Sequence, residues 1–177
     1  MSASAFLDPQ FSDALVESRI VLTPPSHHEI VITRVLNAPR ELVFAAWTQP
    51  EHIKRWWGPD GFQGMVCEVD LRVGGHFNLN LRGPDGIDYP CEGTYHEIVP
   101  NERIVYSGMT DDRHPCGCGI PPHSLVTVHF VEHGAGKTRL TINARVNSGM
   151  CDAIVQGGFV PGWSQATARL DSYLAGA

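Results

Sequence analysis

Histidines and cysteines gathered in one segment are the first side chains in this sequence with the chemistry for a functional site. The segment Asp111–Pro122 reads DDRHPCGCGIPP. Thiolate and imidazole are good ligands for zinc or copper. The Cys-x-Cys spacing differs from a zinc knuckle, however, and the two glycines suit a tight loop without metal, so a redox-active or incidental thiol pair is the alternative. The candidate metal ligands are His114, Cys116, Cys118 and His123.

His96 and Tyr106 are the candidates for acid–base chemistry. His96 shares one face of an expected strand with Ile98, so an inward Ile98 would turn the imidazole toward the interior, where it could bind a ligand or act as a general base. A core histidine with satisfied hydrogen bonds is the alternative. The sequence contains no Gly-x-Ser-x-Gly motif, phosphate-binding loop or dinucleotide fingerprint. We therefore expect no cofactor and no assigned catalytic residue, and we lean against an enzyme.

The spacing of apolar residues predicts the strands and helices that must position these side chains. A strand over Glu29–Leu36 precedes two short helices, the first capped by Asn37 with Pro39 in its first turn, the second over Glu51–Trp57. About six antiparallel strands follow, separated by Gly and Pro turns. Their expected ranges are Met65–Leu71, Phe77–Arg82, Cys91–Val99, Arg103–Met109, Ser124–Glu132 and Lys137–Val146.

A long amphipathic helix closes the chain. Ser148 is a candidate cap, and Pro161 should kink the helix or begin its last segment. A curved sheet gripping one helix would leave a mostly apolar cavity between them, although the same side chains could simply fill a core. The expected ligand-binding residues are Trp56, Trp57 and Phe62 at the mouth, with Phe77, Leu79, His96, Tyr106, Val128, Phe130, Phe159 and Trp163 inside. Arg34, Arg103 and Arg145 are expected to be surface partners of acidic residues.

Composition narrows the class of protein. The chain has 177 residues, a formal net charge of −6, and 18% charged residues. These values argue against nucleic-acid binding and against an anionic-membrane anchor. The start lacks a secretory signal and no apolar run is long enough to cross a bilayer, so we expect a cytoplasmic protein with reduced cysteines and no membrane insertion. Residues 1–27 are expected to be an extension with a short helix carrying Ala14, Leu15 and Ile20, and residues 28–177 a single domain.

Several segments together resemble a known family, named after the activator of the heat-shock protein 90 ATPase. The segment Ile32–Phe62 carries the longest match, ITRVLNAPRELVFAAWTQPEHIKRWWGPDGF. The others are EVDLRVGGHF, RGPDG, HEIVPNERIVYS, KTRLTI and GWSQATARLDSYLA. The resemblance implies the helix-grip fold of the START-like (SRPBCC), birch-pollen-allergen-like superfamily. That is an α+β fold in which a curved antiparallel sheet of about seven strands wraps around the C-terminal helix.

The resemblance also implies a choice of functions. Members of the wider superfamily bind lipids, sterols, polyketides or flavonoid-like molecules, so we expect non-enzymatic binding of a small hydrophobic or aromatic molecule. The family name implies a chaperone cofactor in the stress response, although residues 1–27 are too short for the separate N-terminal domain of the eukaryotic co-chaperone. A third possibility is a cyclase or hydrolase that uses a cavity His or Tyr. We expect a monomer or homodimer.

Overall fold

The computed structural model describes residues 17–23, 27–108, 124–147 and 158–176. One eight-stranded antiparallel sheet has the order β1-β2-β8-β7-β6-β5-β4-β3. Its strands are β1 (Glu17–Thr23), β2 (His27–Leu36), β3 (Gln63–Val69), β4 (His76–Arg82), β5 (Asp88–Val99), β6 (Arg103–Gly108), β7 (Leu125–Glu132) and β8 (Thr138–Asn147). The helices are α1 (Arg40–Thr48), α2 (Pro50–Trp56) and α4 (Phe159–Ala175).

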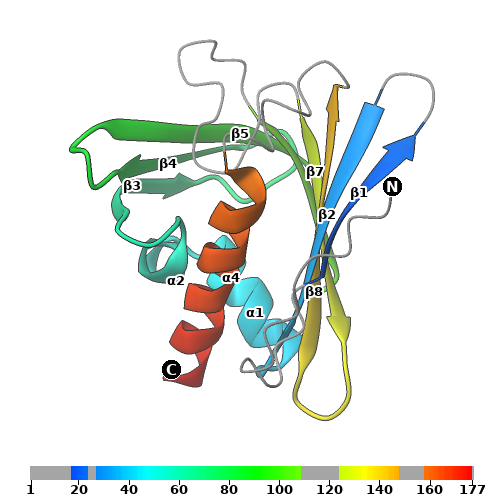
Figure 1. Cartoon of the computed structure of the whole chain (residues 1–177). Helices are drawn as coiled ribbons and strands as arrows, with labels where there is room; N and C mark the ends of the chain where they lie inside the picture. The colour runs from blue at the N-terminus through cyan, green and yellow to red at the C-terminus, as the bar shows by residue number, and fades with distance from the viewer. Residues whose placement is uncertain (1–16, 24–26, 109–123, 148–157, 177) are drawn as a thin grey trace, which may run out of the picture.

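The sheet bends around α4, as the sequence predicted. In Figure 1 the strands β3, β4 and β5 cross the direction of β2 and β8, and α4 lies in the concavity with α2 on one side of it and α1 on the other. This confirms the α+β helix-grip architecture, with two short helices after strand β2. The concave face is apolar because alternate residues of each strand point inward. Its strand residues include Ile30, Ile32, Phe77, Leu79, Leu81, Ile104, Tyr106, Val126, Val128, Phe130, Leu140 and Ile142.

The expected helix in the N-terminal extension is wrong at Ile20. Ile20 lies in β1, opposite Ile30 of β2. The β-branched and apolar run Ile20–Leu22 suits a strand, and β2 would otherwise be the edge of the sheet with unpaired backbone groups. Pairing satisfies those groups, so the strand outcompetes a short isolated helix. Ala14 and Leu15 lie outside the described residues.

Helix α4 begins at the break that the sequence indicated. Gly158 adopts a left-handed conformation with φ of 87°, and Pro161 occupies the first turn. A proline costs little there because the first N–H groups of a helix lack intrahelical acceptors. Ser148 lies outside the described residues. The expected cap at Asn37 is wrong: Pro39 is the N-cap of α1, and its carbonyl accepts the N–H of Leu42 and Val43.

Gly93 in β5 shows why one strand position needs the smallest residue. A Cβ atom there would collide with the Phe77 ring and with the backbone oxygen of Ser107. The absence of a side chain lets Phe77 lie across β5 and meet Tyr106 edge-on, with ring centroids 5.3 Å apart and planes at 86°. Gly93 therefore sets the position of two residues of the candidate site.

Candidate functional site

The tryptophans lie buried together where α1, α2 and α4 meet. Trp47 of α1 stacks on Trp163 of α4, with centroids 5.7 Å apart and planes at 5°. Trp57 meets Trp163 edge-on at 5.1 Å, and the Trp56 ring is 4.9 Å from that of Trp47. Trp56 and Trp57 were expected at a cavity mouth, but both are buried. The indoles join the helices inside the molecule: Trp47 and Trp57 pack on Trp163 of α4, and Trp56 packs on Trp47 and Trp57.

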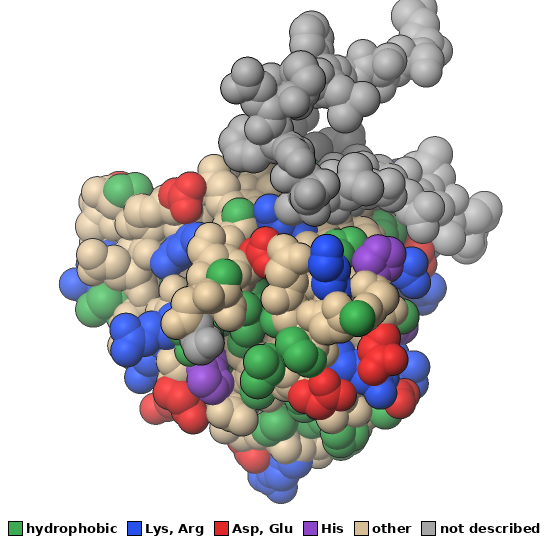
Figure 2. Space-filling view, turned by 90° about the horizontal axis from the view of Figure 1, so that it is seen from below, with side chains coloured by type: hydrophobic (Ala, Val, Ile, Leu, Met, Phe, Trp, Pro, Cys, Tyr) green, Lys and Arg blue, Asp and Glu red, His purple; other side chains and the backbone are tan. Residues whose placement is uncertain are grey.

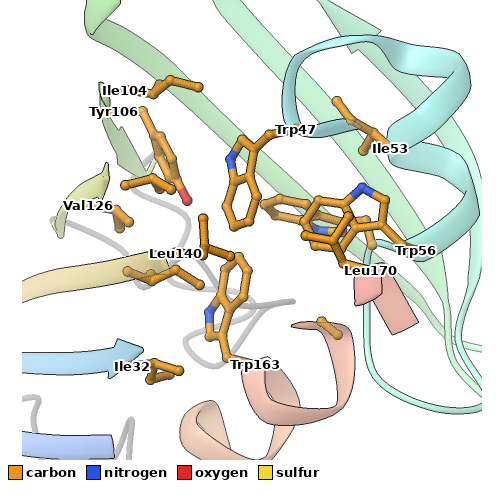
Figure 3. Close-up of a cluster of buried hydrophobic side chains, with 14 of the residues drawn as sticks. Ile32, Trp47, Ile53, Trp56, Ile104, Tyr106, Val126, Leu140, Trp163 and Leu170 are labelled. Atoms are coloured by element: carbon orange, nitrogen blue, oxygen red, sulfur yellow. The ribbon is translucent and has the colours of Figure 1, made fainter. Parts of the chain in front are cut away.

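Two buried donors in this interior have no hydrogen-bond acceptor among the described residues. The Tyr106 hydroxyl and the Trp57 indole Nε1 are both inaccessible to solvent and unpartnered. Trp56 differs, since its Nε1 donates to the Ala46 carbonyl at 2.8 Å. Buried polar groups are normally satisfied, and an unsatisfied one costs about 1–3 kcal/mol. Figure 3 shows the Tyr106 hydroxyl pointing into the cluster, in the direction of Trp47 and Leu140.

The surroundings of Tyr106 keep its hydroxyl protonated. The side chain is fully enclosed, with Phe77 and Tyr95 edge-on to its ring. Burial raises the pKa of Tyr106 well above its ordinary value, and the neighbouring Tyr95 and Cys91 add to the shift. Burial also raises the pKa of Tyr95. Tyr106 is therefore suited to donate a hydrogen bond to a ligand and unsuited to act as a general base near neutral pH.

Most of the other predicted binding residues face the same interior. Phe77 and Leu79 reach it from β4, Val128 and Phe130 from β7, and Phe159 from the first turn of α4. The Phe130 ring lies 6.0 Å from that of Trp47, which places it inside the tryptophan cluster. Phe62 is different: it is partly buried at the edge of the core, 5.5 Å from the Tyr89 ring.

His96 does not face the interior, which corrects the expectation from its strand face. The register of β5 against β6 shifts between Tyr95 and Glu97, so His96 is the extra residue of a bulge and its side chain is exposed. Its Nε2 lies 2.7 Å from the Ser107 hydroxyl on the outer face. Tyr95 takes the inward position. Strict alternation cannot reveal a bulge, because one added residue reverses the face of its neighbours.

The metal candidates cannot be placed, because His114, Cys116, Cys118 and His123 lie outside the described residues. Within residues 17–23, 27–108, 124–147 and 158–176, no three His, Cys, Asp or Glu side chains gather as metal ligands would. In the same ranges no helix has the length and hydropathy to cross a membrane.

An open groove on the outer side of α4 is a site that the sequence reasoning missed. Its volume is about 740 Å³, and it is lined by Arg34, Arg55, Asp60, Ser164, Gln165, Ala168, Arg169, Ser172 and Tyr173.

Arg34 was expected to pair with an acidic residue on the surface, as Arg103 does with Glu97 and Arg145 with Glu29. It instead donates to α4. The signal was present: Arg34 has the strand parity of Ile32 and Leu36, which face inward.

Comparisons with known proteins agree with this architecture. Residues 37–175 match the family described as Activator of Hsp90 ATPase homolog 1-like protein. A search of curated proteins found no match.

Solved structures with the same fold come from several bacteria. A protein from Nitrosomonas europaea is 26% identical, with a TM-score of 0.71 over 83% of this chain and 94% of its own. One from Chromobacterium violaceum is 28% identical, with a TM-score of 0.67 over 82% of this chain and 96% of its own. An AHSA1-like protein from Aeromonas hydrophila is 22% identical, with a TM-score of 0.63 over 82% of this chain and 92% of its own. With its sheet wrapped around α4 and the family match over residues 37–175, the chain belongs to the activator of Hsp90 ATPase homolog 1-like family.

Proposed function

We propose that the protein binds a small, largely apolar or aromatic molecule between the curved sheet and α4. The observation that carries this proposal is a pair of buried donors in an aromatic interior, Tyr106 and Trp57, for which the described residues supply no acceptor. A ligand carbonyl or ether oxygen would satisfy either donor, because both groups donate and the tryptophan cannot accept. Apolar walls with few polar groups are typical of small-molecule sites.

The interior side chains explain what kind of ligand this would be. Trp47, Trp57, Trp163, Phe77 and Phe130 present ring faces and edges at the separations at which aromatic groups attract one another. A flat aromatic molecule could replace some of these contacts with its own ring. Since Trp47 and Trp163 stack directly on each other, binding would require α4 to move relative to α1. The proposal thus specifies a flat ligand with at least one acceptor.

The test is a titration that follows tryptophan fluorescence with a panel of flavonoids, fatty acids and sterols. Tyr106→Phe keeps the ring and removes only the hydroxyl, so it should weaken an acceptor-bearing ligand about tenfold, the loss expected for one buried hydrogen bond. Tyr89→Phe is the matched control, because the Tyr89 hydroxyl bonds to Asp85 at an exposed turn. Failure of the folded wild-type protein to bind any member of the panel would reject the proposal.

A chaperone-cofactor role is a second candidate, and it rests on the family description alone. Its test is the ATPase rate of a bacterial heat-shock protein 90 homologue with and without the protein. An unchanged rate at saturating protein would count against it. An enzymatic role has less support, since His96 is exposed on the outer face and Tyr106, with its raised pKa, is unsuited to act as a base.

We also propose that this binding takes place in the cytoplasm. Cys67 and Cys91 carry thiols rather than a disulfide, which suits a reducing compartment. Fractionation of the source cells would test this assignment, and recovery of the protein outside the cytoplasm would reject it.

A further inference from the structure

The groove on the outer side of α4 collects arginines that form no direct ion pair with the described residues. Arg40, Arg72, Arg82, Arg103 and Arg145 each form an ion pair with a carboxylate. Arg34, Arg55 and Arg169, which line the groove, form none with the described residues. Asp60 is the acidic residue in the lining, so the groove carries a net positive charge on a chain of net charge −6.

Two of these arginines are held in position by neutral acceptors. Arg34 donates through Nη1 to the Ser164 carbonyl at 3.0 Å and to the Thr167 hydroxyl at 3.1 Å. Arg169 donates through Nη1 to the carbonyls of Gly58 and Pro59, both at 2.9 Å. A carbonyl or hydroxyl fixes a guanidinium without neutralising its charge. Both side chains are therefore preorganised while their charge stays available to a ligand.

The surroundings of Arg34 do not fully compensate the burial of its positive charge. Its Nε is buried and has no hydrogen-bond partner in the parts of the chain that the structure describes. Burial lowers the pKa of Arg34, and the attraction of Asp171 offsets this only in part. A bound anion would supply the missing negative charge. Arg55 is exposed in the last turn of α2, and within the described part of the chain it forms no hydrogen bond or ion pair that would hold it away from such an anion.

The groove is separate from the aromatic interior. Trp163, Ala166, Thr167 and Leu170 form the buried side of α4, whereas Gln165 and Ser172, which line the groove, are exposed. In Figure 2, acidic and basic side chains mix over the lower end of the molecule rather than forming faces of one sign. The positive charge of the groove is thus local, set by the side chains that converge there.

We propose that this groove is a binding site for an anionic group, a carboxylate or a phosphate, carried by a small molecule or a lipid headgroup. Guanidinium groups bind both anions through paired N–H donors, and such charge-assisted hydrogen bonds are about twice as strong as neutral ones. Arg34 and Arg169 would form the fixed walls of the site, and Arg55 would close on the ligand. Asp60 would favour ligands that also carry a donor near the anion.

The experiment measures affinity for citrate and for inorganic phosphate by calorimetry, at low ionic strength because salt screens exposed charges. Arg55→Gln is the informative variant, since Arg55 makes no hydrogen bond to the other described residues and its loss should leave the fold intact. Arg139→Gln is the matched control: Arg139 is exposed on β8, outside the groove, and forms no ion pair with the described residues. The dissociation constant should rise about tenfold in Arg55→Gln and stay unchanged in Arg139→Gln.

A second arm separates the two sources of the anion. Flotation with phosphatidylglycerol vesicles, and with neutral phosphatidylcholine vesicles as reference, tests a lipid headgroup. Binding of citrate or phosphate that depends on Arg55 identifies a soluble ligand, and Arg55-dependent flotation with phosphatidylglycerol alone identifies the headgroup. Equal weakening in Arg55→Gln and Arg139→Gln would mean general charge attraction and would overturn the proposal. Absence of binding in every arm would overturn it as well.

Discussion

Trp47 and Trp163 stack with their ring planes at 5° and their centroids 5.7 Å apart, and this contact joins α1 to α4. Both indoles are buried, at 3% relative exposure each. Offset stacking of buried aromatic rings adds about 0.5–1.5 kcal/mol to the stability expected from their burial alone. The stack therefore holds the gripped helix against the rest of the fold.

Replacing Trp163 with alanine should lower the free energy of unfolding by about 3–5 kcal/mol, because it removes a large buried side chain and leaves a cavity. The free energy of unfolding is measured by urea denaturation, with circular dichroism as the signal. A double-mutant cycle with Trp47→Ala should give a coupling energy of about 0.5–1.5 kcal/mol. Additive losses would show that the stack contributes no energy of its own. Val73→Ala is the control, since Val73 is 65% exposed.

Tyr106→Phe should raise the stability of the ligand-free protein. The substitution keeps the ring contacts with Phe77 and Tyr95 and removes a buried hydroxyl without an acceptor, a gain of about 1–3 kcal/mol. Thermal unfolding of the two proteins compares them directly. A variant less stable than the wild type would mean that the hydroxyl is satisfied, for instance by a buried water molecule.

Gly93→Ala should destabilise the fold, because the added methyl group collides with Phe77 and with the Ser107 backbone oxygen. We expect a loss of about 1–3 kcal/mol, the range for overpacking a close-packed interior. Gly64→Ala is the matched control on strand β3, where the nearest atom to an added Cβ is 3.6 Å away. Equal denaturation midpoints for the two variants would contradict the close approach at Gly93.

The thiol of Cys67 should react slowly at mildly alkaline pH. Burial raises its pKa from 9.0 to about 11, although Lys54 acts in the opposite direction. At pH 8 the thiolate fraction falls about a hundredfold relative to an unperturbed thiol. Iodoacetamide labelling, read by mass spectrometry of the Cys67 peptide, should be slow in the folded protein and fast in urea.

The raised pKa of Cys67 also makes the stability of the fold depend on pH. The folded state holds the Cys67 proton more tightly than the unfolded state, so the contribution of this thiol to stability is complete below pH 9.0 and declines as the pH approaches about 11. Cys67→Ser should reduce the alkaline loss of stability over this interval. An identical pH dependence in the wild type and the variant would contradict the raised pKa.

The sequence by itself determined the architecture and most of the interior. Regular alternation in β4, β7 and β8 marked Leu79, Val128 and Leu140 as inward, because successive side chains of a strand point to opposite faces. The proline at the start of α4 and the glycines at the turns marked where elements end. The resemblance of Ile32–Phe62 to a known family supported the same fold.

Tertiary structure decided the details of the site. Tyr95 points inward with Cys91 and Gly93, and the bulge beside His96 changes the phase of β5 after that point, so the inward face of Ile98 did not extend to His96. Ile20 became a strand residue because the edge of β2 was open to pairing. Arg34, Arg55 and Arg169 are far apart in sequence and meet only because α2 and β2 both border α4. The missing acceptors of Tyr106 and Trp57 likewise depend on which groups the packed fold brings near them, and no sequence pattern records an absent partner.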